Sequence, residues 1–220
     1  MPTSHSTQAT PTECFALLDD HNASSSDPRS RLYTHFMGAL TCTTAAEFPS
    51  LIEKMQRALQ QGQHALVLFS YELGAEMHGI AQRDGVTELA QVLLFNNCDL
   101  LSAEQVSSWL AMREKSECKQ QEYGNASVRS AGIAGVHTAM TEAAYTNALN
   151  TAHAYISAGD TYQVNFTYRI HFDAFGSLFS LYRRLRERQP VPYGALIVLP
   201  HGGALLSMSP ELFVRHENGH

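Results

Sequence analysis

The sequence has little charge, and its charge has the wrong sign for a nucleic-acid binder. Charged residues make up 16% of the 220 residues, well below the roughly 25% typical of soluble domains. Fifteen Lys and Arg against 21 Asp and Glu leave a net charge of −6. Binding to a phosphate backbone requires a local excess of cations. The one basic run, Arg183 to Arg188, has no interleaved aromatic platform, so we interpret it as a solvated helix face and expect no nucleic-acid partner.

Cysteine is scarce and long apolar runs are lacking. The four cysteines include no Cys-x-x-Cys pair, which disfavours a disulfide scaffold and a zinc site and favours a reducing compartment. The longest apolar runs, 65–69 and 195–199, fall far short of the roughly 20 residues of a membrane-spanning helix. The polar N-terminus resembles no signal peptide. We therefore expect a cytoplasmic protein with no membrane partner.

Several motifs that carry chemistry are also lacking. There is no glycine-rich phosphate loop and no Gly-x-Ser-x-Gly elbow, so dinucleotide binding and hydrolase chemistry have no support. Eleven histidines are present, but none stands in a His-Glu-x-x-His arrangement. We assign no metal site to this chain.

The first half alternates short apolar runs with amphipathic segments. Residues 1–12 are rich in Ser, Thr and Pro, which is typical of a loose tail. Thr44 and Glu47 have the spacing of a capping box at the start of a predicted helix that ends at Gly62. Ser102 and Gln105 have the same spacing at the start of a second predicted helix, which is expected to run to about residue 115. Strands are predicted at 14–18, 31–39, 64–70 and 91–98, with the first two paired. Residues 118–135 are polar and small, which indicates a connection.

The second half begins with a predicted helix over 141–158 that ends at Gly159. Residues 162–172 (YQVNFTYRIHF) alternate apolar and polar side chains for eleven positions, the pattern of a strand with one exposed face. A helix is expected over 176–188, then a hairpin of 193–199 with 204–208, and a last strand over 211–216. Asn218 and Gly219 form a hairpin-turn signal with only one residue after it, so either the last strand is frayed or the structural unit normally continues.

Two groups of polar residues are candidate sites. The polar face of the alternating segment presents Gln163, Asn165 and Arg169, which suit a small polar ligand but also suit an ordinary solvated strand face. Ser209, Pro210 and Glu211 follow a predicted strand directly. A carboxylate fixed there can act as a general acid or base, or it can be an edge charge that prevents strand pairing.

Several segments together resemble a known family. GDTYQVNFTYRIHF (159–172), QPVPYGALIVL (189–199) and LLSMSPELF (205–213) resemble, in this order and spacing, the chorismate-utilising family of anthranilate synthase and aminodeoxychorismate synthase component I. FALLDD (15–20), SRLYTHF (30–36) and ALVLFSYELG (65–74) resemble the aminodeoxychorismate synthase branch in particular. The resemblance covers roughly residues 13–220.

The resemblance implies an α+β fold, an antiparallel β-sandwich clad by helices. It divides the chain into a tail (1–12), an N-terminal region (13–120), a connection (121–136) and the start of a chorismate-binding domain (137–220). The implied reaction converts chorismate and ammonia to 4-amino-4-deoxychorismate for p-aminobenzoate and folate synthesis, with a glutamine amidotransferase partner supplying ammonia. Glu211 is the implied catalytic residue, and Gln163, Asn165 and Ser209 lie in the implied substrate neighbourhood.

The later motifs of the family are not present in this sequence. A Lys within a Pro-Ile-Lys-Gly-Thr motif and the carboxylates that bind Mg²⁺ would follow further along the chain. Without the Lys nucleophile and the metal ligands, Glu211 lacks the groups it would act with. We therefore expect a truncated fold, inactive alone and poorly folded, because half of the sandwich would be missing and strand edges would be exposed.

The resemblance also implies an effector pocket for tryptophan. Its residues here would be Asp19 and Asp20 after the first strand, and Pro190, Pro192 and Tyr193 before the hairpin. Asp20 stands where anthranilate synthases have a Ser, which favours the folate branch. That extra carboxylate could instead pair with a Lys or Arg, or these residues could only form a turn.

Two alternative functions stay open at this point. One is anthranilate synthase component I, which eliminates pyruvate and serves tryptophan synthesis. The other is a non-catalytic remnant that binds an amidotransferase or an aromatic amino acid. Product analysis, pull-down with a glutaminase and calorimetry with tryptophan would separate these possibilities.

Overall fold

The computed structural model describes residues 13–80, 88–122 and 131–216. It divides into two compact units, which are described separately. Unit 1 comprises the chain up to Leu110 and again from Tyr182 onward, and unit 2 comprises Ala111–Leu181. The predicted division at 13–120 and 137–220 stays a prediction.

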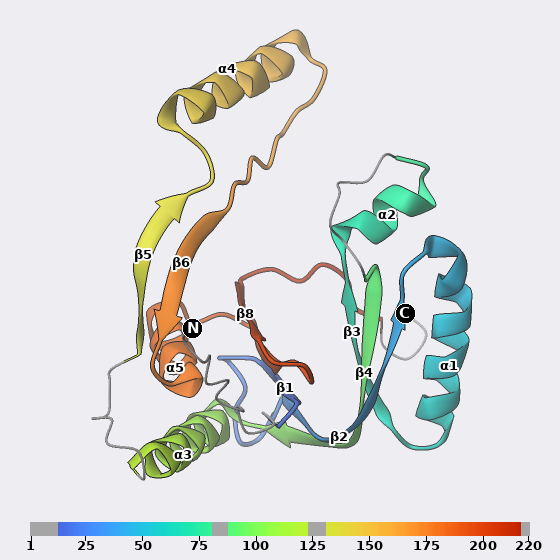
Figure 1. Cartoon of the computed structure of the whole chain (residues 1–220), viewed down its shortest axis with the longest axis vertical. Coiled ribbons are helices and arrows are strands. Elements are labelled where there is room, and N and C mark those ends of the chain that lie inside the picture. Colours follow the sequence, from blue (N-terminus) through green and yellow to red (C-terminus); the bar gives the residue numbers. More distant parts are fainter. Residues whose placement is uncertain (1–12, 81–87, 123–130, 217–220) are drawn as a thin grey trace, which may run out of the picture. The chain divides into compact units, whose positions relative to one another are not determined.

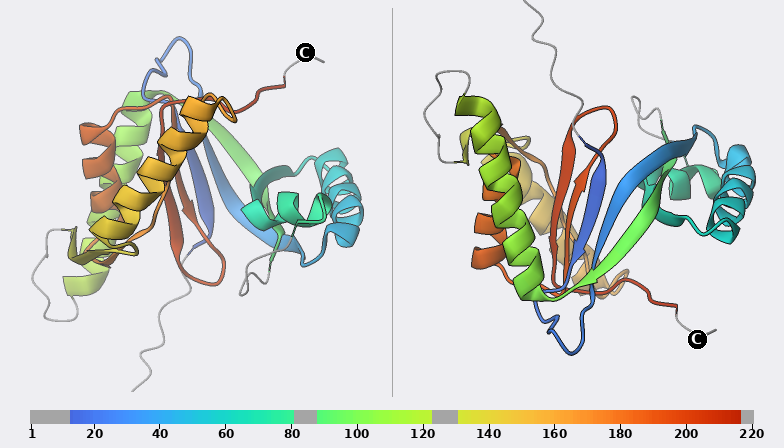
Figure 2. Two further views of the ribbon diagram at one scale, coloured as in Figure 1. Left: turned by 90° about the horizontal axis from the view of Figure 1, so that it is seen from above. Right: turned by 90° about the horizontal axis from the view of Figure 1, so that it is seen from below.

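Unit 1 is built on one six-stranded sheet with the strand order β3-β4-β2-β1-β7-β8 (Figure 1). All neighbouring strands are antiparallel. The strands are β1 (Phe15–Asp19), β2 (Ser30–Cys42), β3 (His64–Phe69), β4 (Ala90–Leu101), β7 (Tyr193–Val198) and β8 (Ala204–Ser209). The sheet is curled, which the two views of Figure 2 show.

The predicted strands of the first half and the hairpin are confirmed. β1 pairs with β2, with Leu17 opposite Leu32, and β7 pairs with β8 across the turn at Gly202 and Gly203. Both turn glycines have positive φ, 90° and 83°, which favours glycine at these positions. β2 and β4 extend beyond their predicted ends because they pair along nearly their whole lengths, from Ser30 opposite Leu101 to Cys42 opposite Ala90.

The helices of unit 1 begin with a short 3-10 turn, Ala45–Glu47, followed by α1 (Phe48–Gln60). The predicted Thr44 cap is wrong, because Thr44 makes no side-chain capping bond. The Glu47 carboxylate instead accepts from the backbone N–H of Thr43 at 2.8 Å. Pro49, which lacks an N–H and has a fixed φ, lies in the first turn of α1 and favours a helix start there. Helix α2 (Tyr71–Met77) was not predicted; the Ser70 hydroxyl caps it.

The core of unit 1 lies on both faces of β4. Val92 and Leu94 pack on one face with Leu51 of α1 and Leu73 of α2, whereas Leu93 and Phe95 pack on the other. This follows from the period of two along a strand and explains why the apolar run of β4 is continuous. The second cluster joins Leu66 of β3 with Ile197 of β7, strands four places apart in the sheet order, which fits a curled sheet.

Two helices extend across the boundary between the units, α3 (Ala103–Glu122) and α5 (Leu178–Arg188). The predicted capping box of α3 is confirmed. The Ser102 hydroxyl accepts from Gln105 N–H at 3.2 Å, and the Gln105 side chain accepts from Ser102 N–H at 2.8 Å. Within unit 1, Trp109 of α3 meets Phe15 of β1 edge to face, with ring centroids 5.2 Å apart. This end of α3 therefore packs on β1.

Unit 2 contains a two-stranded antiparallel sheet and a helix. The strands are β5 (Gly132–Thr138) and β6 (Ile170–Phe175), and the helix is α4 (Glu142–Ala158). The predicted helix is confirmed, with Thr141 as N-cap and Gly159 at φ 81° as the left-handed end. β5 was not predicted; it lies largely within the segment that the composition indicated as a connection.

Two predicted strands are wrong. Residues 162–169 form no strand; of the alternating segment, only the part from Ile170 belongs to β6. A strand requires a partner, and β5 pairs only with Ile170 and residues after it. Residues 211–216 also form no strand. The turn signal at Asn218 and Gly219 lies outside the described residues.

The fold class is confirmed at the level of a mixed α and β structure with a curled antiparallel sheet and helices. In the described part of the chain, the strands form one six-stranded and one two-stranded sheet. The sandwich, with a second layer facing the first, stays a prediction. None of the described helices is both long and apolar enough to cross a membrane.

Candidate functional site

The candidate site is a pocket of about 580 Å³ in unit 1. It lies where β1 ends and β7 begins, and the segment that follows β8 forms another wall. Its lining combines acidic, basic and apolar side chains: Leu18, Asp19, Asp20, Pro28, Arg29, Arg31, Leu100, Pro192, Tyr193, Gly194, Ala195, Leu212, Val214, Arg215 and His216. Such a mixture suits a small ligand with both charged and apolar parts.

Strand pairing brings the two predicted halves of the effector pocket together. β1 and β7 are antiparallel, and Asp19 at the end of β1 lies opposite Gly194 near the start of β7. Tyr193 and Pro192 therefore lie beside Asp19 and Asp20 although more than 170 positions separate them in sequence. Four of the five predicted effector residues line the pocket; Pro190 does not.

Gly194 is required by close packing at this junction. A Cβ at this position would lie 2.9 Å from the Tyr182 hydroxyl and 3.3 Å from the Asp19 carbonyl oxygen. Both distances are shorter than ordinary van der Waals contacts. Glycine therefore allows the start of β7 to pack against Asp19 and Tyr182.

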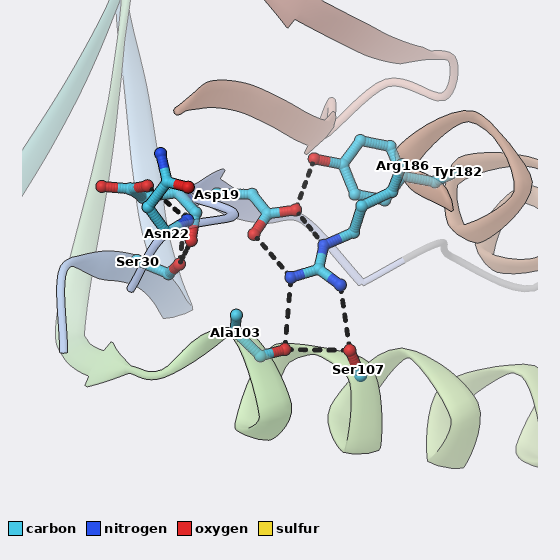
Figure 3. Close-up of polar contacts among 8 residues, drawn as sticks. Asp19, Asn22, Ser30, Ala103, Ser107, Tyr182 and Arg186 are labelled. Carbon is cyan, nitrogen blue, oxygen red and sulfur yellow. Dashed lines mark hydrogen bonds and ion pairs between the residues drawn. The ribbon is translucent and has the colours of Figure 1, made fainter. Parts of the chain in front are cut away.

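The Asp19 carboxylate is buried and held by three hydrogen bonds from α5 (Figure 3). Arg186 donates from Nε to Oδ2 at 2.6 Å and from Nη2 to Oδ1 at 3.4 Å. The Tyr182 hydroxyl donates to Oδ2 at 3.2 Å. The Asp19 side chain is 3% exposed and the Arg186 side chain 11%, so the ion pair is shielded from water.

The Arg186 guanidinium also connects to α3. It donates to the Ser107 hydroxyl at 2.9 Å and to the Ala103 carbonyl at 3.2 Å, as Figure 3 shows. One side chain thereby links β1, α3 and α5. A charge buried in this way is stabilised by its partners, and removal of one partner leaves an uncompensated charge. The arrangement fixes the Asp19 carboxylate at the pocket wall.

The interpretation of Arg183 to Arg188 as a solvated face is wrong for Arg186, which is 9% exposed. A signal was present in the sequence. Tyr182 is a large, mainly apolar side chain suited to a core, and Arg186 lies four positions later on the same helix face. Nothing in the sequence identified Asp19 as its partner, because 167 positions separate the two residues.

Tyr182 is neutral in this environment. Burial raises its pKa, and the Asp19 charge and the hydrogen bond to Asp19 raise it further. The hydroxyl therefore keeps its proton and acts as a donor to Asp19.

The Asp20 carboxylate takes part in two local interactions. Its Oδ2 pairs with Arg29 Nε at 3.0 Å, and its Oδ1 accepts from the Asn22 backbone N–H at 2.8 Å. The Asp20 N–H donates to the Ser30 hydroxyl at 3.0 Å. The predicted pairing with an Arg is confirmed for Asp20. The alternative that it only forms a turn is wrong, because Asp20 also makes this ion pair and lines the pocket.

The predicted active-site residues are divided between the two units. Glu211 is exposed, does not line the pocket, and accepts through its carbonyl from the Ser209 hydroxyl at 3.0 Å. Ser209 is paired with Tyr193 across β8 and β7. Gln163 and Asn165 belong to unit 2, where both are exposed and the Gln163 amide donates to Asn165 Oδ1 at 3.1 Å.

The described residues do not fit a metal ion held by a full set of side chains. No group of three or more His, Cys, Asp or Glu gathers within residues 13–80, 88–122 and 131–216. The described cysteines Cys14, Cys42 and Cys98 are free.

The comparisons with known proteins agree on one family. A profile of the family described as chorismate binding enzyme matches residues 6–220. Aminodeoxychorismate synthase component 1 of Klebsiella aerogenes is 28% identical over 227 aligned residues, covering 87% of this chain and 48% of the relative. That of Salmonella typhimurium is 37% identical over 81 residues, covering 37% and 18%.

The other branch of the family also matches. Anthranilate synthase alpha subunit 2, chloroplastic, of Arabidopsis thaliana is 37% identical over 79 residues, covering 36% of this chain and 13% of the relative. In all three comparisons the chain spans less than half the length of the curated relative it matches.

Proposed function

The chain belongs to the chorismate binding enzyme family, and from this we propose that it is part of an aminodeoxychorismate synthase component 1. Such an enzyme would convert chorismate and ammonia to 4-amino-4-deoxychorismate, a precursor of p-aminobenzoate and folate. The observation that supports this branch most is the length of the match, since the relative covering 87% of the chain has that name.

The environment of Asp20 supports the same branch. The family resemblance puts a Ser at this position in anthranilate synthases, and here an acidic side chain pairs with Arg29 at 3.0 Å. Anthranilate synthase component 1 is the alternative, because relatives named as anthranilate synthase subunits, component 1 or alpha subunit 2, match at 34–37% identity over shorter segments.

We propose a glutamine amidotransferase as the partner that releases ammonia from glutamine. The relatives' designation as component 1 supports a partner component. Cys14, Cys42 and Cys98 are free, which fits the cytoplasmic location proposed for the enzyme.

The proposed catalytic residue is Glu211, with Gln163, Asn165 and Ser209 around the substrate. The carboxylate of Glu211 is suited to move a proton, and the two amides are suited to hold substrate hydroxyl or carboxylate groups. Mg²⁺ would supply charge neutralisation and help the 4-hydroxyl depart, but its proposed ligands lie outside these 220 residues. We therefore propose that these 220 residues alone do not catalyse the reaction.

Product analysis tests the proposed branch. The chain is mixed with the C-terminal half of the Klebsiella aerogenes relative, chorismate, ammonia and Mg²⁺, and products are identified by mass. We expect a product that retains the enolpyruvyl group. Release of pyruvate with anthranilate would instead establish the anthranilate synthase branch. The same C-terminal half without the chain is the control.

A second function is supported by the pocket of unit 1, which we propose binds an aromatic amino acid as effector. Arg31 and Arg215 line it and suit a carboxylate, Asp20, which also pairs with Arg29, suits an ammonium group, and Leu18, Leu100 and Leu212 suit a ring. The charge of Asp19 is already paired with Arg186. The pocket therefore has separate groups for the two charges and the ring of such a ligand.

Calorimetry with L-tryptophan tests the effector proposal. Binding should be saturable in the wild-type chain and weakened in Arg31→Ala, whose side chain lines the pocket. Arg57→Ala is the matched control, since Arg57 is exposed on α1 and pairs with Glu53. An absence of heat in the wild type, or equal weakening by both substitutions, would remove this proposal. A pull-down with the glutaminase separately tests the alternative that the chain is a non-catalytic remnant that binds only an amidotransferase.

A further inference from the structure

Two exposed histidines face each other across the small sheet of unit 2. His137 of β5 lies directly opposite His171 of β6 in the register of the two strands, which Figure 1 shows side by side. Directly opposed residues of an antiparallel pair project from the same face. Their rings are stacked, with centroids 5.2 Å apart and planes at 19°. Neither residue belongs to the proposed chorismate or effector sites.

A backbone contact selects the tautomer of His137. Its Nδ1 lies 3.0 Å from the Gly135 carbonyl oxygen. Since a carbonyl can only accept, Nδ1 carries the hydrogen and donates it, which leaves the lone pair on Nε2. Metal-binding histidines typically have this arrangement, with the second ring nitrogen donating to a carbonyl or carboxylate.

A bulge in β5 contributes to the position of His137. The register shifts between Ala134 and His137, and Gly135 within the bulge has φ 61°, which favours glycine. Asp173 lies two positions after His171, on the same face of β6, and its Oδ2 is 3.0 Å from where a Gly135 Cβ would be. A carboxylate on the same face of β6 as His171 favours a cation on this face.

We propose that His137 and His171 form a two-histidine surface site for a divalent transition ion such as Ni²⁺, Cu²⁺ or Zn²⁺. Imidazole nitrogen suits these ions. Two nitrogens that bind one ion, each at about 2.0–2.1 Å from it, lie at most about 4.2 Å apart. The ring centroids of these exposed histidines are 5.2 Å apart, so rotation of the side chains can bring two nitrogens within that distance. Water completes the coordination, in keeping with the lack of any three-residue metal cluster in the described chain.

Titration of the untagged 220-residue chain with Ni²⁺ tests the site. His137→Ala and His171→Ala should each weaken the tightest binding step at least about tenfold, because loss of even an outer-shell partner typically costs 10–100-fold. The double variant should bind Ni²⁺ at most about twofold more weakly than either single variant. The reason is that both histidines hold the same ion. The matched control is His153→Ala, an exposed histidine on α4 of the same unit.

Further variants and a second measurement separate loss of a ligand from loss of the hairpin. His137→Gln and His171→Gln keep polar side chains on the strands and should lose the ion as the Ala variants do, with unchanged circular dichroism. Electron paramagnetic resonance with half an equivalent of Cu²⁺ should show two nitrogen ligands in the wild type and one in each single variant. Unchanged Ni²⁺ affinity in a single variant, additive losses in the double variant, or equal loss in His153→Ala would overturn the proposal.

Discussion

Unit 1 and unit 2 differ most in how much of their apolar surface is buried. Unit 1 buries clusters on both faces of β4, including Leu93 and Phe95 at 0% exposure. Among the described residues of unit 2, only Ala131 and Phe179 are buried. In β6, Ile170 and Phe172 are 51% and 49% exposed although they have the same apolar character as the strand residues of unit 1.

The difference shows that apolar residues at strand spacing are buried only where a neighbouring strand or helix packs against them. The strands of unit 1 lie in a six-stranded sheet with helices packed on it, whereas β5 and β6 form a pair. A two-stranded sheet is at best marginally stable by itself. Stability should therefore reside in unit 1, and substitutions in the two units should have very different costs.

The largest expected effect is at the buried ion pair of unit 1. Arg186→Met removes the partner of Asp19 and should lower the free energy of unfolding by about 3–5 kcal/mol. The measurement is urea denaturation followed by fluorescence of Trp109, the single tryptophan, which contacts Phe15 in unit 1. Arg183→Met is the control, since Arg183 is more exposed and 4.0 Å from Glu187, and should cost within about 1 kcal/mol. Equal losses would contradict the role given to Arg186.

A matched pair of apolar truncations compares the units directly. Leu93→Ala in unit 1 empties a fully buried position and should cost about 2–5 kcal/mol. Phe172→Ala in unit 2 removes a side chain that is already half exposed, and its effect on the same Trp109 transition should be much smaller. A comparable shift from both variants would show that unit 2 shares the cooperative core of unit 1.

Two glycines sharpen the comparison within unit 1. Gly194→Ala brings a methyl group into contact with Tyr182 and the Asp19 backbone and should cost about 1–3 kcal/mol. Gly74→Ala, on α2 with open space around the added Cβ, should instead stabilise by about 0.5–1 kcal/mol. Urea midpoints of both variants test the signs. A neutral Gly194→Ala would mean that the strand junction at the pocket tolerates more movement than its packing indicates.

A further expected effect is a pH dependence. Burial raises the pKa of the Cys14 thiol from 9.0 to about 11. The folded state therefore retains a proton that the unfolded state has released, so the contribution of Cys14 to stability is complete below pH 9 and is lost as pH rises toward 11. The difference between wild-type and Cys14→Ala unfolding free energies should shrink over this range. A constant difference would mean that the thiol titrates alike in both states.

The sequence predicted the fold best where the core formed. Apolar runs located the strands of unit 1, and Ser102 with Gln105 located the start of α3. The alternation over 162–172 misled, because periodicity does not reveal whether a partner strand exists. β5 was missed because Gly132, Ala134 and Gly135 give it the composition of a connection.

The candidate site was predicted in part. Asp19, Asp20, Pro192 and Tyr193 were identified through the family resemblance, and the pairing of β1 with β7 brings them to one pocket. Arg186 and Gly194 were missed because their roles depend on contacts with distant residues. Arginine on a helix is usually solvated, so its type alone favours the wrong interpretation.

Incubation of the purified chain with chorismate, ammonia and Mg²⁺ tests most directly the claim that these 220 residues form an ordered pocket but not a complete catalytic centre. Products are followed by mass spectrometry, and unit 1 is shown to be folded by Trp109 fluorescence in the same samples. We expect no consumption of chorismate beyond that in a protein-free sample. Turnover to 4-amino-4-deoxychorismate, lost on Glu211→Gln, would contradict this account.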